Sequence, residues 1–394
     1  MNEVYVVSAV RTAIGTFGGS LKDVPPSQLA AKVTGEALRR SGIAPAEVGH
    51  VVFGQVIHTE PRDCYIARVA AVDAGIPVET PALTVNRLCG SGLQAIISAA
   101  QCIRLGDCDV AVAGGAENMS RSPFQAPSIR WGTKMGSAPM VDVLDGALRD
   151  PFDRVLMGVT AENIAEKNGI SRGDQDALAC ESHRRAEYAI KAGYFKEQIV
   201  GIDVKSRKGP TIFDTDEHVR SGASGGDFEH LKPVFKRDGG SVTAGNSSGI
   251  NDGAAAVVLA SADAVKRLGL KPMARLVAYA HAGVEPLYMG LGPIPATRMV
   301  LKKAGMTVDQ FDTIESNEAF AAQACAVARE LGFDPAKVNP NGSGISLGHP
   351  VGATGAIITV KAMYELARTG GRYALVTMCI GGGQGIAAVF ERQN

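Results

Sequence analysis

The chain has 394 residues, of which 45% are hydrophobic and 5% aromatic, and it contains 47 glycines. This length and composition predict an α/β protein with a large core and tight turns, and they exclude a coiled coil or a disordered chain. Forty basic residues balance forty acidic ones, so no net field would draw the protein to nucleic acid or to an anionic membrane, and we expect neither as a partner.

The cysteines do not have the spacing of a disulfide framework or of a structural zinc site. There are seven of them, and no Cys-x-x-Cys occurs, which argues against both kinds of site. The amino-terminal residues do not have the basic and then apolar segments of a signal peptide, and no apolar run is long enough to span a bilayer. We therefore expect a protein of a reducing compartment, the cytoplasm.

Strands and helices alternate in the first part of the chain. Apolar runs predict strands at 4–10, 51–53, 81–85 and 110–113. Helical patterns occupy 29–38, 68–74 and 93–100, and the first of these lies between Pro25-Pro26-Ser27 and Gly42, which are typical start and stop signals.

Cys89 lies in the turn Asn86-Arg87-Leu88-Cys89-Gly90-Ser91-Gly92, between a predicted strand and a predicted helix. Unpaired N–H groups at a helix start, together with the helix dipole, favour negative charge. A thiol in this place can therefore have a pKa below its usual value of about 8.5. The flanking glycines favour a nucleophile, although a buried apolar cysteine is the commoner role.

The same order of elements returns 263 positions later in the chain. Residues 301–311 repeat the pattern of 38–48, so that Gly305 aligns with Gly42. At this offset Cys89-Gly-Ser-Gly92 aligns with Gly352-Ala-Thr-Gly355, and each turn precedes an apolar helix and then a strand. Several matches at one offset predict a duplication, and hence two similar α/β halves packed on each other.

The segment between the two halves has a different character. Proline-rich loops begin near residue 120 and are followed by an amphipathic pattern at 174–192. We predict that residues 1–119 and 250–270 form an N-terminal half and that 271–394 form a C-terminal half. Residues 120–249 are then an inserted loop domain, a type of insertion that commonly binds ligands.

Three polar segments of the C-terminal half are predicted at the ends of strands or in glycine-rich loops, where α/β proteins gather their chemistry. They contain Asn317, His349 and Cys379. A cysteine nucleophile needs a base and donors for an oxyanion, and His349 can be that base. Asn317 can orient the histidine or donate to an oxyanion, or it can simply cap the following helix. The amides of Cys89 and Gly381 can form a second donor pair, and Cys379 can move a proton to and from carbon.

These motifs, in this order, resemble the thiolase family of acetyl-CoA acetyltransferases and β-ketothiolases. The resemblance runs nearly end to end and is carried by Val6-Val7-Ser8-Ala9-Val10-Arg11-Thr12, Cys89-Gly-Ser-Gly92, Gly114-Gly115-Ala116-Glu117-Asn118-Met119-Ser120, Asn317-Glu-Ala-Phe320, Gly348-His349-Pro350 and Cys379-Ile-Gly-Gly-Gly383. Arg130-Trp131-Gly132 is similar to the bacterial broad-range β-ketothiolases, which make or cleave short 3-ketoacyl-CoAs, including in polyhydroxyalkanoate synthesis.

The resemblance implies two five-stranded mixed sheets in five α/β/α/β/α layers, and a homotetramer. It also implies that Cys89, activated by His349, takes an acyl group from an acyl-CoA. Cys379 then removes a proton from acetyl-CoA for a Claisen condensation, which runs in reverse when CoA cleaves a 3-ketoacyl-CoA. The enolate oxygen would lie near Asn317 and His349, and the acyl-enzyme oxyanion near Cys89 and Gly381. CoA is a co-substrate in this scheme, and no metal or other cofactor is implied.

The resemblance places CoA on the inserted segment. Arg220 is expected at the adenine end and Ser248 at the pantetheine. The expected tunnel residues, for which plain core packing is the alternative, are Leu148, Met157, Phe235, Met289 and Phe320, and Ala244, in the same motif as Ser248, is also expected to bind CoA. Many family members have His-Met-Gly where this chain has Leu156-Met157-Gly158, so one polar contact to pantetheine is expected to be missing.

Two other functions remain open on the same residues. A decarboxylative 3-ketoacyl synthase uses a similar scaffold but generally lacks the second cysteine, so Cys379 argues against it. A non-catalytic acyl-CoA binding protein would not need Cys89, His349 and Cys379 together.

Overall fold

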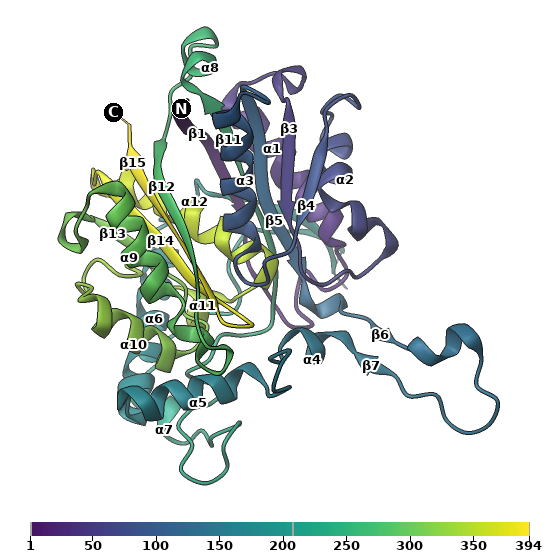
Figure 1. Ribbon diagram of the computed structural model, residues 1–394, viewed down its shortest axis with the longest axis vertical. Helices are drawn as coiled ribbons and strands as arrows, with labels where there is room; N and C mark the ends of the chain where they lie inside the picture. The colour runs from purple at the N-terminus through teal and green to yellow at the C-terminus, as the bar shows by residue number, and fades with distance from the viewer. Residues whose placement is uncertain (1, 207–208, 394) are drawn as a thin grey trace.

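Strands from both ends of the chain join in one mixed sheet. In the computed structural model, which describes residues 2–206 and 209–393, this sheet has 11 strands (Figure 1). The N-terminal half has the order β4 (Ala82–Val85), β3 (His50–Gly54), β5 (Val110–Asn118), β11 (Asn251–Ser261), β1 (Val4–Thr12). The C-terminal half continues with β12 (Ala274–Gly283), β15 (Gln384–Arg392), β14 (Tyr373–Ile380), β13 (Thr313–Ser316). Two short strands, β2 (Gly15–Thr16) and β8 (Ile199–Val200), pair with β11 and β1.

Both halves have the same pairing pattern, which runs outward from their junction. β1 and β12 meet as antiparallel edge strands through only two residue pairs, Tyr5 with Arg275 and Val6 with Ala274. In the N-terminal half, β1 pairs with β11 and β11 with β5 in antiparallel fashion, and β5 then pairs with β3 in parallel. In the C-terminal half, β12 with β15 and β15 with β14 are antiparallel, and β14 with β13 is parallel.

The C-terminal half has four of the five strands that were expected. Beyond β13, the described residues form only a single parallel bridge, between Ile314 and Val338. The ladder ends there because Asn339 has a φ of 45° and Pro340 has no N–H to donate.

Helices cover both outer faces of the sheet halves and fill the space between them. The N-terminal half packs outward on α1 (Pro26–Ser41) and α2 (Ile66–Asp73), and the C-terminal half on α9 (Pro293–Ala304) and α10 (Ala321–Leu331). The largest core lies between the halves, around α3 (Ser91–Leu105) and α12 (Val351–Thr369). This arrangement confirms the predicted α/β fold of five layers (Figure 1).

The predicted duplication is visible in how corresponding helices end. Gly42 follows α1 and Gly305 follows α9, and both adopt left-handed φ values, 71° and 65°. Glycine reaches this region without the steric penalty of a side chain, so it stops a helix at the same place in both halves.

The two central helices touch at their first turns through glycine. A Cβ on Gly92 would lie 2.6 Å from the backbone nitrogen of Ala356, and one on Gly355 would collide with the backbone nitrogen of Leu93. Gly92 and Gly355 are the pair that the repeat aligns. Their missing side chains let the start of α3 approach the start of α12 closely.

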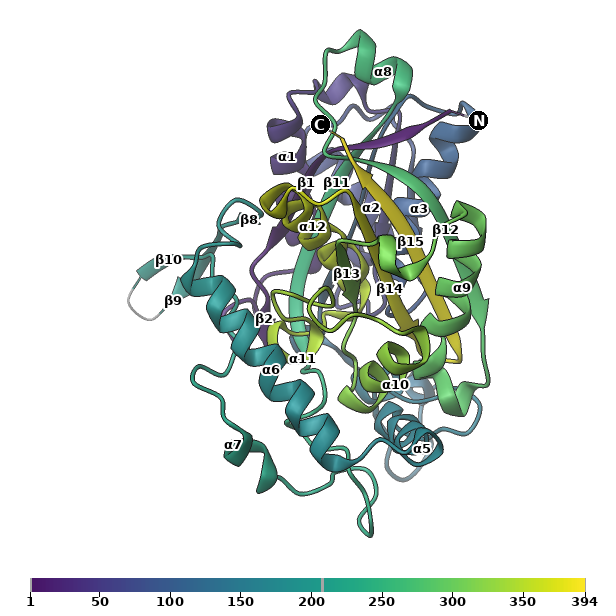
Figure 2. The same ribbon diagram turned by 90° about the vertical axis from the view of Figure 1, so that its left-hand side faces the viewer.

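The segment after β5 wraps one end and one side of the molecule (Figure 2). Its helices are α4 (Val143–Ala147), α5 (Met157–Asn168), α6 (Arg172–Lys191) and α7 (Gly225–Glu229), and its strands besides β8 are β6 (Phe124–Gln125), β7 (Val141–Asp142), β9 (Ile202–Ser206) and β10 (Gly209–Phe213). It is tied to the sheet by a buried ion pair between Arg11 and Asp216, 2.7 Å apart. A hairpin arm between β6 and β7 projects away from the rest of the chain (Figure 1).

The remaining elements are short connections. The helices α8 (Ala262–Arg267) and α11 (Gly344–Leu347) follow β11 and precede α12. The 3-10 helices are Pro45–Glu47, Pro61–Tyr65, Met119–Arg121, Pro127–Trp131, Pro286–Leu291 and Val308–Gln310. Within the described ranges, no helix combines the length and the apolar character needed to cross a membrane. The bounds of the three predicted segments stay a prediction.

Candidate active site

A small cavity of about 60 Å³ lies where the two halves and the segment after β5 meet. Its wall is mostly apolar and carries two thiols and one imidazole. The lining residues are Val56, Leu88, Cys89, Ala147, Leu148, Met157, Ser248, Met289, Ala319, Phe320, His349, Val351, Cys379 and Gly381. Four of the five residues predicted to be catalytic therefore share one cavity, and the fifth, Asn317, contacts His349.

Cys89 is presented by a strained turn just before α3. Leu88 has a φ of 46°, a left-handed conformation that is uncommon for a leucine. The turn is held by its neighbours: the Leu88 amide donates to Asn86 Oδ1 at 2.9 Å, and the Ser91 hydroxyl donates to the Leu88 carbonyl at 2.7 Å. Strain of this kind persists where surrounding contacts over-determine it, and it is typical of functional sites.

The environment of the Cys89 thiol differs from the expectation of a low pKa. Burial raises the pKa of Cys89, and the N–H groups of Gly381 and of Cys89 itself, which donate to the sulfur, only partly oppose that rise. The expected lowering at a helix start is thus wrong for the resting site, because desolvation of a thiolate in this apolar cavity outweighs the helix start. That the same two amides also donate to an oxyanion stays a prediction.

His349 lies between α11 and α12 with its ring held at both nitrogens. Nδ1 is 2.6 Å from the Thr354 hydroxyl, and Nε2 is 3.4 Å from Asn317 Nδ2. Its backbone N–H donates to Asn251 Oδ1 at 2.9 Å. Burial alone lowers the pKa of His349 to about 4, so the imidazole is neutral at physiological pH and can accept a proton.

Asn317 follows β13 and faces the histidine rather than the helix after it. The N-cap of α10 is Phe320, so Asn317 does not cap that helix. Its backbone N–H donates to the Thr377 carbonyl at 3.0 Å, which joins it to β14. This excludes the capping role that the sequence had left open.

Cys379 lies near the end of β14, 1% exposed, and faces Cys89 across the cavity. Burial and, to a smaller extent, the neighbouring Cys89 raise the pKa of this thiol. At neutral pH Cys379 is therefore a protonated acid. Its thiolate, once formed, would be a strong base.

Glu117 does not line the cavity but joins segments near it through hydrogen bonds, a role that the sequence did not predict. The carboxylate of this buried residue accepts N–H groups from Val56 and Ile57, both at 3.0 Å, and from Gly352 at 2.9 Å. Burial raises the pKa of Glu117 to about 8, against the opposing effect of these amides. It connects β5 of one half to the first turn of α12 in the other. The only signal in the sequence is its place in the motif Gly114–Ser120.

The predicted CoA residues divide into two groups. Ser248 and the apolar residues Leu148, Met157, Met289 and Phe320 all line the cavity. The other three lie outside it and are Arg220, Phe235 and Ala244.

Each of these three outer residues has a different setting. Phe235 packs on the cavity residue Phe320, with the two ring centroids 6.3 Å apart. Arg220 is exposed, and its guanidinium lies 5.7 Å from the ring centroid of Phe228. Ala244 is also exposed. Contacts of these residues with CoA stay a prediction.

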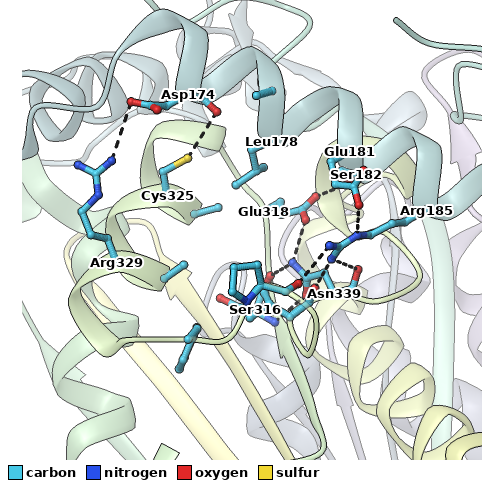
Figure 3. Close-up of a pocket in the computed structure, with 16 residues that line it drawn as sticks. Asp174, Leu178, Glu181, Ser182, Arg185, Ser316, Glu318, Cys325, Arg329 and Asn339 are labelled. Carbon is cyan, nitrogen blue, oxygen red and sulfur yellow. Dashed lines mark hydrogen bonds and ion pairs between the residues drawn. The ribbon is translucent and has the colours of Figure 1, made fainter. Parts of the chain in front are cut away.

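A second, larger cavity of about 370 Å³ lies on the other side of the Asn317 loop, between α6 and α10 (Figure 3). Glu318 lines it, and its carboxylate accepts hydrogen bonds from Ser182 at 2.6 Å and from Asn339 at 2.8 Å. None of the residues predicted to be catalytic lines this cavity. The hydrogen bonds to Glu318 fix the loop that carries Asn317 on the side away from the small cavity.

The described residues contain no group of three or more His, Cys, Asp and Glu side chains arranged to hold a metal ion. The expectation of a reaction without a metal or other cofactor remains a prediction.

Family models and known proteins match nearly the whole chain. The model of the thiolase N-terminal domain matches residues 4–263, and that of the thiolase C-terminal domain matches 270–392. "Beta-ketothiolase BktB" of Cupriavidus necator is 66% identical over 99% of both chains. The crystal structure of the Bacillus anthracis acetyl-CoA acetyltransferase has a TM-score of 0.97 and 46% identity, and covers 100% of this chain and 99% of its own.

A human mitochondrial 3-ketoacyl-CoA thiolase, solved in complex with CoA, has a TM-score of 0.96 and 43% identity, and covers 100% of this chain and 98% of its own. Both family models, the sequence identities and the shared fold agree with the motifs that surround the cavity. The chain belongs to the thiolase family.

Proposed function

We propose that this protein is a β-ketothiolase, an acyltransferase that cleaves 3-ketoacyl-CoA with CoA and catalyses the reverse condensation of acetyl-CoA with an acyl-CoA. One observation carries the proposal: Cys89, His349 and Cys379 lie on the wall of one apolar cavity. A nucleophile, a base and an acid are the groups that reversible cleavage of a carbon–carbon bond requires.

In thiolysis, Cys89 gives its proton to His349 Nε2 and its sulfur attacks the 3-keto carbon. The developing oxyanion accepts N–H groups of Cys89 and Gly381, which already donate to the sulfur in the resting site. The bond between C2 and C3 then breaks. The acetyl-CoA carbanion, with its charge on an enolate oxygen near Asn317 and His349, takes the proton of Cys379.

The second half of the reaction restores every proton. CoA gives its thiol proton to the Cys379 thiolate, and the CoA sulfur attacks the acyl group on Cys89. When the carbon–sulfur bond breaks, Cys89 leaves as a thiolate and takes the proton back from His349. The raised pKa of Cys379 supports its role, because the thiol must be protonated at neutral pH when the carbanion forms.

The small volume of the cavity supports a short acyl group. About 60 Å³ leaves room for a few carbon atoms between Leu88, Leu148 and Met289. CoA itself would approach over the segment after β5, with Ser248 at the pantetheine and Arg220 at the adenine end. Support comes from the four cavity residues that this segment supplies, Ala147, Leu148, Met157 and Ser248.

The test is thiolysis of acetoacetyl-CoA by the purified protein with CoA, with acetyl-CoA measured as the product. Cys89→Ala should abolish the activity while the protein keeps its fold. A wild-type protein without thiolysis, or a Cys89→Ala variant that retains it, contradicts the proposal. Condensation that proceeds only with a malonyl thioester would favour the decarboxylative synthase instead.

A homotetramer in the cytoplasm is the assembly and location that we propose. The projecting arm supports self-association, because Trp131 and Met135 at its tip are 90% and 92% exposed. The open edge of β4, where Leu83 is 45% exposed, offers a second contact. Multi-angle light scattering should give the mass of four copies for the full chain. A variant in which a short glycine linker replaces the arm should give the mass of fewer than four copies.

The proposed location is supported by the cysteines. All seven are free, as expected in a reducing compartment.

A further inference from the structure

The ring of His349 is oriented by a hydroxyl and not by a carboxylate. In Ser-His-Asp sites an acidic side chain holds the far nitrogen of the histidine and stabilises its protonated form. Here no charged group contributes to the lowered pKa of His349, which burial alone accounts for. The far nitrogen, Nδ1, instead contacts Thr354 Oγ1 at 2.6 Å.

The hydrogen bonds of Thr354 assign the proton between the two residues. Oγ1 lies 2.9 Å from the carbonyl oxygen of Pro350, which can only accept. The single hydroxyl proton therefore points to Pro350, and a lone pair of Oγ1 faces the ring. It follows that Nδ1 carries a hydrogen and donates it to Thr354.

A separate contact on the other side of the ring gives the same answer. Asn317 Nδ2 is 3.4 Å from His349 Nε2, and an amide nitrogen only donates. With the amide nitrogen turned toward the ring, as in this structure, Nε2 accepts and carries a lone pair, which agrees with the assignment from Thr354. His349 lines the cavity that holds Cys89, and this lone pair is available to take the cysteine proton.

We propose that Thr354 is a positioning residue that keeps neutral His349 in the tautomer with hydrogen on Nδ1 and the lone pair, not a hydrogen, on Nε2. Thr354 is 2% exposed, and its hydroxyl is fixed by its bond to a carbonyl of its own first helical turn. A neutral hydroxyl orients the ring but stabilises an imidazolium less than a carboxylate would, so the proton that His349 takes from Cys89 can return when the acyl group leaves. This inference rests on the proposed role of His349 as the base.

A matched pair of variants separates hydrogen bonding from packing. Thr354→Val keeps the shape but removes the acceptor, whereas Thr354→Ser keeps the acceptor but loses a methyl group. We expect Thr354→Val to lower kcat for thiolysis by roughly 10²-fold, the low end of the range for a general base. KM for CoA should not change, because Thr354 does not line the cavity. Thr354→Ser should stay within a few-fold of the wild type.

The proton itself can be observed by ¹⁵N NMR of histidine-labelled protein, with the His349 signal assigned by its loss in His349→Gln. The wild type should show hydrogen on Nδ1 and Thr354→Val a shift toward Nε2. Hydrogen on Nε2 in the wild type, or a Thr354→Ser variant as impaired as Thr354→Val, overturns the inference. If the wild type has no thiolase activity, the proposed function fails, and the NMR measurement still tests Thr354 on its own.

Discussion

The two halves share a backbone plan but hold different chemistry at the same position of that plan. The N-terminal half has Cys89 in the turn before its central helix, where the C-terminal half has Gly352 in the first turn of α12. The C-terminal half in turn supplies His349 and Cys379 from loops and strand ends around that helix. A duplicated scaffold can thus place a nucleophile on one copy and the proton-transfer groups on the other.

Burial favours the uncharged form of the cavity side chains from both halves. It raises the pKa of Cys89 and of Cys379 and lowers that of His349. All three groups are therefore neutral in the resting site at neutral pH. In the proposed reaction, charge forms only as the reaction proceeds, and the amides of Cys89 and Gly381 would receive it.

The largest expected effect comes from removing the proposed acid, Cys379, which tests whether the two halves have separate chemical roles. Cys379→Ala should lower thiolysis by about 10³-fold, within the range for a general acid, because the carbanion then has no proton donor. Cys89 should still become acetylated on mixing with acetyl-CoA, which mass spectrometry of the intact protein detects. Cys325→Ala, in the other cavity, should change neither reaction. Loss of acetylation in Cys379→Ala would contradict the division between the halves.

The next effect concerns the pH dependence of Cys89. Its pKa is raised above the ordinary value, so the thiolate fraction should grow about tenfold per pH unit from pH 7 to about pH 8 and should still be rising above that. The rate of inactivation by iodoacetamide should rise in parallel. His349, with a pKa of about 4, stays neutral over this interval and adds no further step. A plateau below pH 8 would instead indicate a resting ion pair between Cys89 and His349.

A smaller effect is expected where the halves touch. Gly355→Val places side-chain atoms against the Leu93 backbone, and overpacking of this kind lowers the free energy of unfolding by about 1–3 kcal/mol. Urea denaturation measures it. Gly146→Ala is the control, because a Cβ there meets no atom within 4 Å. Equal stability of the two variants would show that the central helices can separate slightly at little cost.

The smallest effect lies in the segment after β5. Leu156 precedes α5 and is adjacent to the cavity residue Met157. Leu156→His should restore the polar contact to pantetheine that many family members have. A hydrogen bond worth about 0.5–1.5 kcal/mol would lower KM for CoA by up to about tenfold. Leu105→His, at a residue 80% exposed on α3, should leave KM unchanged.

The sequence predicted the elements whose signals are local. The helix stops at Gly42 and Gly305, the strand that leads to Cys89 and the repeat itself are all present in the structure. The helix stops and the strand depend on periodicity or on backbone preferences within a few residues, and the repeat adds up such local matches at one offset. The residues predicted to be catalytic come from short motifs of unusual composition, and four of the five line one cavity.

The supporting contacts could not be predicted in the same way. Glu117 accepts an N–H from Gly352, which is 235 residues away in the chain, and neither position indicates the other. Thr354 looks like an ordinary residue of an apolar helix until the ring of His349 is in place. The helix-start argument for Cys89 failed for a related reason, because desolvation depends on the walls of a cavity that distant segments build.

The glycine contact between α3 and α12 has a mechanical consequence. Cys89 precedes one of these helices and His349 the other, and at Gly92 and Gly355 their backbones meet without intervening side chains. Side chains can change rotamer and absorb displacement, whereas a backbone-to-backbone contact cannot. When one half moves, the start of the other helix has to move with it. A displacement of either helix start is therefore expected to carry Cys89 and His349 together.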